Sequence, residues 1–297
     1  MATRGDDLED DFIVDDIVAL SEDEEEETSE GHDPMSTHGE EPESSAAQET
    51  SAKIEKKRKR REQERLKFKE RKKRKLAEAH DPVLESSITE QPPQALADYL
   101  ATFQSKTFSS TMSALELEDL RIPADSIADT SIWTGPRTLD SLVDFIIKVL
   151  PNLHLRLSQR SKTTGAPTLL FVAGAALRVV DVTRVLKDQK LRGEKGGEVA
   201  KLFAKHFKLA EHVTYLRRTK VGSAVGTPGR IGKLLCETDA LAVNALSHII
   251  LDVSFRDAKN RNILDIPETR DEIFKTVIGA PKVLQAIKEG KIQVVLF

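Results

Sequence analysis

Cysteine is almost absent from this sequence, and long apolar runs are missing altogether. One cysteine, Cys236, in 297 residues excludes an intramolecular disulfide framework and a zinc site built from several cysteines, which favours a reducing compartment. No run approaches the roughly 18 apolar residues of a membrane helix, and the N-terminus lacks the basic and apolar regions of a secretory signal. We therefore expect a soluble, non-secreted protein without membrane contact. Cys236 stands in an amphipathic stretch, where a small buried residue is expected.

Lys and Arg are absent between Asp6 and Glu43, so the formal net charge of -4 conceals two opposite blocks. Residues 1–52 have too little apolar surface to offset the entropy of ordering, which predicts an acidic disordered tail. Such a tail either only solvates the chain or docks basic partners, and both readings stay open. Ser21 precedes an acidic run that begins at Glu22, the context that acid-directed kinases prefer, and is a candidate phosphorylation site.

The basic block at residues 53–80 contains good helix formers, no Gly and no Pro, and too few apolar residues for a core-facing stripe. We expect an exposed helical arm. Two clusters of Lys and Arg predict a nuclear import signal, read by importins, and a sequence-independent, salt-sensitive contact with RNA phosphates. Without interleaved aromatics, base-specific readout by the arm is not expected. The cluster residues are Lys56, Lys57, Arg58, Lys59, Arg60, Arg61, Arg71, Lys72, Lys73, Arg74 and Lys75.

Residues 92–157 read as the helical N-terminal part of a folded core. Short helices are expected at 98–108 and 113–120, and a capped amphipathic helix at 138–150, which Pro151 ends. The last of these presents apolar residues at helical spacing, which predicts one buried face formed by Leu139, Leu142, Val143, Ile146, Ile147 and Leu150.

Residues 158–297 alternate between strand-like and helix-like stretches after a polar linker. This alternation predicts an α/β domain: a single parallel sheet with helices on both faces. The expected strands are 168–173, 223–226, 247–252 and 291–297. The expected helices are 175–187, 198–207, 209–217, 228–237, 268–277 and 281–289.

Three of these strands carry motifs in the order and rough spacing of the first domain of DEAD-box helicases. The segment at 225–231, Val-Gly-Thr-Pro-Gly-Arg-Ile, resembles the family's Thr-Pro-Gly-Arg motif. An apolar strand ends at Asp252, where the family has Asp-Glu-Ala-Asp, and the strand at 293–297 is similar to the one that leads into Ser-Ala-Thr. The resemblance implies a RecA-like domain of the P-loop NTPase type.

The Thr-Pro-Gly-Arg segment also has a physical reading. Thr227 and the amides around Gly229 and Arg230 stand at a helix N-terminus, where unpaired N–H groups and the helix dipole favour a phosphate. Arg230 adds a charge-assisted contact. We expect Thr227, Gly229 and Arg230 to face RNA phosphates.

Departures from the helicase pattern argue against catalysis. Val253 stands where the family's Glu activates water, so hydrolysis would lack its base. No Gly-x4-Gly-Lys-Ser/Thr phosphate loop is present, and the sequence stops at Phe297, before Ser-Ala-Thr and a second RecA domain. We expect a degenerate RecA-like domain, no enzyme activity and no cofactor. His206, His212 and His248 lack ligands at metal spacing and are expected to be ordinary histidines, so no metal is predicted.

The combination of motifs resembles the Cms-one family of small-subunit ribosome assembly factors, which are degenerate DEAD-box relatives. Beyond the Thr-Pro-Gly-Arg segment, the segments that carry the resemblance are 113–120, 199–207 and 252–257 with Lys259, and the acidic then basic N-terminus fits too. The resemblance implies the nucleolus, pre-ribosomal RNA, ribosome-assembly proteins as partners, and a monomer within a larger particle. Composition alone indicates only the nucleus and a polyanion.

Three function classes follow from these features. The leading hypothesis is a non-catalytic RNA-binding assembly factor of the small ribosomal subunit, a pseudo-helicase whose basic arm supplies affinity and whose Thr-Pro-Gly-Arg face contacts phosphates. One alternative is a protein scaffold or chaperone of basic proteins that uses the acidic tail as a polyanion. A divergent RNA-stimulated ATPase is the enzyme alternative.

Overall fold

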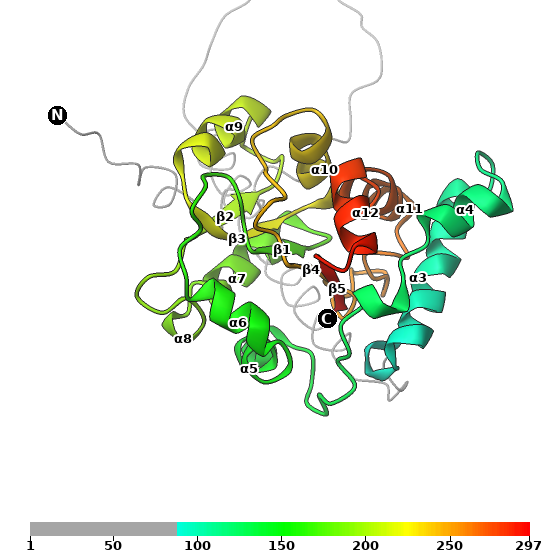
Figure 1. Ribbon diagram of the computed structural model, residues 1–297, viewed down its shortest axis with the longest axis horizontal. Helices are drawn as coiled ribbons and strands as arrows, with labels where there is room; N and C mark the ends of the chain where they lie inside the picture. Colours follow the sequence, from blue (N-terminus) through cyan, green and yellow to red (C-terminus); the bar gives the residue numbers. More distant parts are fainter. Residues whose placement is uncertain (1–87) are drawn as a thin grey trace, which may run out of the picture. The chain divides into compact units, whose positions relative to one another are not determined.

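Five parallel strands form one sheet at the centre of the domain. The computed structural model describes residues 88–297, which all belong to one compact unit. The sheet has the order β2-β3-β1-β4-β5 (Figure 1). The strands are β1 (Leu169–Val172), β2 (Glu198–Leu202), β3 (Val221–Gly226), β4 (His248–Leu251) and β5 (Gln293–Leu296). The predicted acidic tail at 1–52, with Ser21, and the predicted basic arm at 53–80 lie outside the described residues.

The strands are short and apolar because both faces of the sheet are covered. Every residue of β1, β3 and β4 is buried. In β1, Leu170 and Val172 belong to the core on one face, while Phe171 packs its ring edge-to-face with Phe297 on the other, at a centroid distance of 6.4 Å. Phe145 continues this stack at 5.0 Å from Phe297. The sheet therefore lies between two apolar layers.

Helices cover the two faces of the sheet (Figure 1). On one side lie α5 (Leu139–Val149), α6 (Pro151–Leu157), α7 (Ala176–Leu186) and α8 (Gln189–Arg192). The other side holds α9 (Leu209–Arg218), α10 (Pro228–Cys236), α11 (Pro267–Glu272), a π-helical turn (Ile273–Val277) and α12 (Pro281–Lys288). Two further helices, α3 (Pro93–Phe108) and α4 (Ala114–Leu120), and the 3-10 turns Ile88–Glu90 and Ala124–Ser126 complete the described chain. No helix among residues 88–297 is long and apolar enough to span a membrane.

The predicted fold class is confirmed: the domain is α/β, with one parallel sheet between helical layers. The helix expected at 198–207 is wrong, because Glu198–Leu202 is the edge strand β2, which pairs with β3. The buried face of α5 is shifted from the expected one. Leu142 and Ile146, and Leu150 just after the helix, are buried as expected, and Phe145 and Val149 are buried with them. Leu139, Val143 and Ile147 are only partly covered.

Parallel strands give the sheet two chemically different edges. Loops that leave the strands gather at the carboxyl edge, and loops that enter them gather at the amino edge. Outside β5, Ile127 forms a single parallel bridge with Val294, in the place that a sixth strand would take. Residues 129–138 then run from this bridge towards α5 along the carboxyl edge. This edge holds the residues that the sequence singled out.

Candidate functional site

Asp252 follows β4 directly and is held by an arginine from α7. The side chain of Asp252 is fully buried, and Arg178 donates to both carboxylate oxygens, Nε to Oδ2 at 2.7 Å and Nη2 to Oδ1 at 3.1 Å. Burial raises the pKa of Asp252, while Arg178 and the Phe255 amide lower it. The Arg178 guanidinium also lies 4.9 Å from the centroid of the Phe255 ring. An internal cation therefore neutralises the carboxylate at the end of this strand.

The Thr-Pro-Gly-Arg segment closes β3 and opens α10 as predicted, with Thr227 at the N-cap and Pro228 in the first turn. Arg230, however, is buried. Its Nη2 donates to the Phe207 carbonyl at 2.7 Å, and Nε and Nη1 have no hydrogen-bond partner among the described residues. Burial lowers the pKa of Arg230. The guanidinium folds in towards the loop after β2, so the predicted contact of Arg230 with RNA phosphates stays a prediction that requires this side chain to move.

The N-terminus of α10 already holds an anion from the chain. Glu272, the last residue of α11, accepts a hydrogen bond from the Gly229 amide, and the phosphate contact predicted at Gly229 stays a prediction. A Cβ at Gly229 would lie 2.3 Å from Oε1 of Glu272, which shows how closely the carboxylate approaches the backbone. Burial raises the pKa of Glu272, whereas the Gly229 amide and Lys233 lower it. An incoming phosphate would have to displace this carboxylate.

Sequence reasoning missed a third element of the carboxyl edge, the loop at residues 129–138. It joins the Ile127 bridge, which is a single bridge and not a strand, to the N-terminus of α5, and nucleotide-binding folds place their phosphate loop between a strand and a helix. Arg137 fills its interior: Nη2 donates to the carbonyls of Thr89 at 2.7 Å and Thr130 at 3.1 Å, and Nη1 donates to that of Leu296 at 3.1 Å. Burial lowers the pKa of Arg137 to about 10.

Arg137 thus meets carbonyl oxygens, one from this loop at Thr130 and two from Thr89 and Leu296 beside it, whereas a phosphate needs a cradle of amides. Trp133 closes the outer side, where its Nε1 donates to the Pro136 carbonyl at 3.3 Å. The only sequence signal was Gly-Pro-Arg-Thr at 135–138, immediately before a capped amphipathic helix. It lacks the spacing of a phosphate loop, so no motif pointed to this loop.

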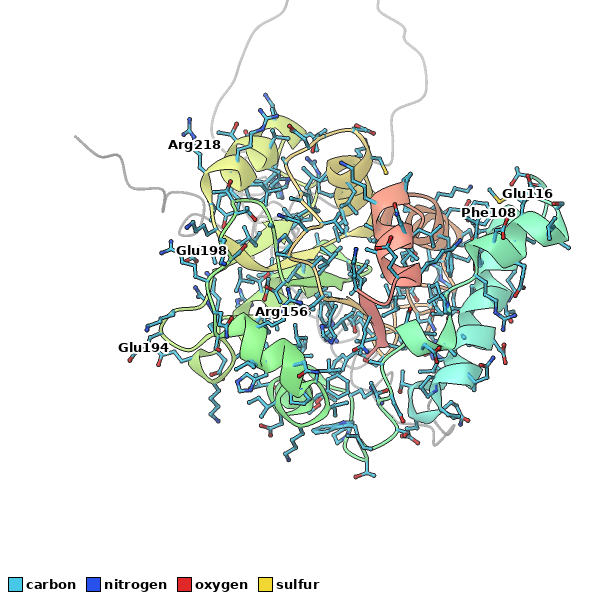
Figure 2. All side chains as sticks on the ribbon, viewed as in Figure 1. Phe108, Glu116, Arg156, Glu194, Glu198 and Arg218 are labelled. Atoms are coloured by element: carbon cyan, nitrogen blue, oxygen red, sulfur yellow. The ribbon has the colours of Figure 1, made fainter. Side chains whose placement is uncertain are left out.

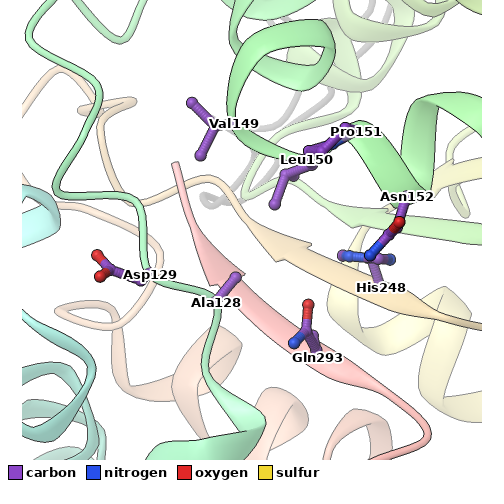
Figure 3. A pocket seen from close by; sticks show the side chains of 8 residues that line it. All are labelled: Ala128, Asp129, Val149, Leu150, Pro151, Asn152, His248 and Gln293. Atoms are coloured by element: carbon purple, nitrogen blue, oxygen red, sulfur yellow. The ribbon is translucent and has the colours of Figure 1, made fainter.

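A small pocket opens at the amino edge, outside the predicted site. Its volume is about 110 Å³, and the side chains of Asn152, His248 and Gln293 line it, with Asp129 across from them (Figure 3). His248 Nδ1 lies 2.9 Å from the Ser247 hydroxyl, and burial, with Arg156 nearby, lowers its pKa to about 4. Burial also lowers the pKa of His212 to about 4. Both histidines are therefore neutral and buried at pH 7.

Two expectations about reactive side chains can be compared with the described residues. No group of three His, Cys, Asp or Glu side chains within residues 88–297 is arranged to hold a metal ion. The expectation of a buried cysteine is wrong: Cys236 lies at the exposed end of α10, 3.4 Å from the Thr276 carbonyl, and burial with nearby Glu237 raises its pKa. A raised thiol pKa lowers the fraction of reactive thiolate.

The family of the chain follows from comparison with known sequences. A family model described as CMS1, U3-containing 90S pre-ribosomal complex subunit, matches residues 39–297. The chain belongs to this family. The resemblance expected from the motifs is thereby confirmed, and membership of the CMS1 family supports a role in ribosome biogenesis and an association with ribosome-assembly components.

Relatives of the chain carry the same family name. Protein CMS1 of Chaetomium thermophilum is 41% identical over 197 residues, which cover 66% of this chain and 76% of that protein. Protein cms1 of Schizosaccharomyces pombe is 34% identical over 207 residues, with 70% of each chain covered. Protein CMSS1 of Homo sapiens is 30% identical over 185 residues, with 62% of each covered.

Two solved structures of DEAD-box proteins are similar at low identity. A DEAD box protein from Methanococcus jannaschii has a TM-score of 0.34 and 17% identity, covering 55% of this chain and 37% of that one. The yeast DEAD-box splicing factor Prp28 has a TM-score of 0.36 and 16% identity, covering 58% and 35%. The CMS1-family chain thus spans about a third of each of these proteins.

Replacing Arg178 tests the buried pair. Arg178→Ala leaves a buried carboxylate without its cation, and we expect the free energy of unfolding at pH 7 to fall by about 3 to 5 kcal/mol. A group whose pKa is higher in the folded chain than in the unfolded chain stabilises the fold at low pH. That contribution to the free energy of unfolding is lost as the pH rises through the folded-state pKa. Removing Arg178 raises the pKa of Asp252 further, so the deficit should shrink as the pH falls. Urea unfolding at pH 4 and pH 7 measures the loss of stability at pH 7 and its decrease at low pH.

Arg184→Ala is the matched control, because Arg184 pairs with Asp181 at 2.9 Å on the exposed side of α7. We expect a loss below about 1 kcal/mol there. Equal losses for Arg178→Ala at both pH values, or a double variant Arg178→Ala/Asp252→Ala no more stable than the single one, would contradict the role given to this pair.

The two buried histidines predict acid sensitivity. Their pKa values of about 4 lie below the usual 6.5, so the unfolded chain binds more protons between these values. Stability should therefore fall as the pH drops from about 6.5 towards 4, by about 1 to 2 kcal/mol per histidine at pH 5. In urea unfolding across this range, His248→Gln should give a flatter profile than the parent chain. A parallel profile would show that His248 does not contribute.

Proposed function

We propose that this chain is a non-catalytic RNA-binding assembly factor of the small ribosomal subunit that acts in the nucleolus as a monomer within the early pre-ribosomal complex. The observation that carries the proposal is the family match over residues 39–297, whose description names the U3-containing 90S pre-ribosomal complex. The acidic tail and basic arm, in a chain of one cysteine, fit a nuclear protein imported by importins and bound to RNA. We further propose Ser21 as a phosphorylation site within the tail.

The absence of catalysis rests on two arginines at the carboxyl edge. Arg178 occupies the carboxylate of Asp252, which is the only acidic residue of the altered Asp-Val-Ser-Phe segment. Arg137 occupies the interior of the loop that stands in the place of a phosphate loop. A nucleotide phosphate with its magnesium ion would need amide donors and an available carboxylate at these two points. Both are already used within the domain.

The basic arm is the principal RNA contact in this proposal. Its clustered Lys and Arg at 56–61 and 71–75 would neutralise phosphates and release counterions, which gives affinity without sequence preference. A contact at Thr227, Gly229 and Arg230 requires Glu272 to leave the helix N-terminus and Arg230 to leave the Phe207 carbonyl. We therefore propose that contact as a secondary one.

Neutralising the arm tests the RNA-binding role. Replacing all Lys and Arg at 56–61 and 71–75 by Gln should weaken binding to a structured RNA at least tenfold, and should lower the slope of log affinity against log salt, because each phosphate contact contributes about one unit. Filter binding over a range of KCl concentrations measures both. Unchanged affinity and slope would remove the arm from the mechanism. Loss of basic-protein binding on deletion of residues 1–45, with RNA binding intact, would favour the scaffold alternative.

Nucleotide turnover tests the absence of catalysis. We expect ATP hydrolysis by the purified chain to stay at background with and without RNA, because the base is missing and both anchoring points are filled. Asp252→Ala serves as the control once circular dichroism shows that it is folded, because the change leaves Arg178 without its carboxylate, and its ATP turnover should also stay at background. Turnover above background that disappears in Asp252→Ala would establish the ATPase alternative.

A further inference from the structure

The amino edge of the sheet carries exposed positive charge on loops that lie next to one another. Arg156 and Arg160 stand at and after the end of α6, Lys162 precedes β1, Lys195 precedes β2, and Arg218 and Lys220 precede β3. We call these six residues the amino-edge surface: Arg156, Arg160, Lys162, Lys195, Arg218 and Lys220. Figure 2 shows Arg156 and Arg218 on the side of the domain away from α3 and α4, where Phe108 and Glu116 lie.

Backbone contacts join the three loops into one surface. The Gly165 amide donates to the Thr219 carbonyl at 2.9 Å, and the Gly165 carbonyl accepts from Ala242 at 2.8 Å. The Glu198 amide donates to the Lys220 carbonyl at 3.0 Å. A Cβ at Gly196 would lie 2.9 Å from the Leu157 carbonyl, so the loop before β2 lies against the end of α6. The cations are therefore carried by mutually braced backbone.

The cations of this surface have no carboxylate partners among residues 88–297. Arg156 donates to the Ala245 carbonyl at 2.8 Å, and no ion pair involves any of the other five. The carboxylates nearby are mostly engaged: Glu198 pairs with Arg192 at 3.3 Å, and Asp239 with Arg217 at 2.7 Å. Glu194 and Glu237 remain as opposing charges on this edge.

The carboxyl edge shows the opposite pattern. Its arginines form ion pairs within the domain: Arg178 with Asp252, Arg256 with Asp265 at 3.1 Å and Arg261 with Asp257 at 2.8 Å. Arg137 and Arg230 are turned onto backbone carbonyls. The exposed arginines without an ion pair, Arg156, Arg160 and Arg218, thus stand at the amino edge. Exposed lysines stand at both edges, with Lys208 and Lys259 at the carboxyl edge.

We propose that the amino-edge surface binds the phosphate backbone of RNA, an inference that rests on the proposed RNA-binding function. Point-like ammonium groups and guanidinium groups on adjoining loops can neutralise successive phosphates. The loops at 158–168, 187–197 and 218–220 contain no aromatic residue, so base stacking plays no part in this contact. The surface reads backbone charge and shape, and it adds to the affinity of the arm.

The test compares the two edges in the full chain with the arm neutralised. One variant carries Lys162→Gln, Lys195→Gln and Lys220→Gln on the amino-edge surface. The matched control carries Lys106→Gln on α3 with Lys208→Gln and Lys259→Gln on carboxyl-edge loops, so both lose the same charge. Binding to a structured RNA hairpin is measured by filter retention over a KCl series. We expect the amino-edge variant to lose about tenfold in affinity and about three units of salt slope, with the control unchanged.

Four other outcomes would overturn the proposal. An unchanged amino-edge variant would remove the surface, and a loss confined to the control would move RNA to the carboxyl edge. Equal losses in both variants would reduce the effect to net charge. If neutralising the arm abolished all RNA binding, the proposed role of the amino-edge surface would be refuted, and the proposed role of the arm would stand. An arm variant without effect, together with a loss in the amino-edge variant, would instead contradict the arm and support the surface.

Discussion

A carboxylate buried at the end of a central parallel strand needs a positive partner, and Arg178 provides it for Asp252. The neighbours of β4 on both sides, and helices on both faces, exclude water from this point, so an uncompensated charge would cost several kcal/mol. The bidentate geometry fixes α7 to the end of β4, and the stacked Phe255 ring fixes the start of the following loop. The packing of the carboxyl edge depends on this pair.

Arg137 meets a related requirement elsewhere on the carboxyl edge. The carbonyls of Thr89, Thr130 and Leu296 converge there, and buried carbonyls need donors. One guanidinium supplies them for the Ile88–Glu90 turn, for the loop itself and for the end of β5. In a nucleotide-binding fold, backbone amides hold phosphates in such a loop. Here a cation donates to backbone carbonyls instead. The arginines of this edge are thus bound within the domain, whereas the exposed arginines Arg156, Arg160 and Arg218 without an ion pair lie at the opposite end of the strands.

Sequence patterns predicted those features that depend on local order. Apolar runs and helix-start signals located β1, β3, β4, β5 and most of the helices, because burial on both faces imposes continuous apolar strands. Glu198–Leu202 was missed because its Ala, Lys and Leu residues have high helix propensity, while pairing with β3 decides its state. The Arg178–Asp252 pair, the Arg137 loop and the Glu272–Gly229 contact join residues far apart in the chain. Only the folded topology brings them together.

The Thr-Pro-Gly-Arg segment shows why a preserved motif is a weak guide to an RNA contact in this domain. The Thr227 amide donates to the Leu202 carbonyl at 3.0 Å, and Pro228 is buried in the first turn of α10. Gly229 leaves space for Glu272, and Arg230 bonds the Phe207 carbonyl. Each residue thus has a packing role that would retain it without any ligand. Of the amino-edge surface, only Arg156 has an internal hydrogen-bond partner, the Ala245 carbonyl, and none of its six cations forms an ion pair within residues 88–297. Comparing the two edges therefore separates residues retained for packing from residues available to bind RNA.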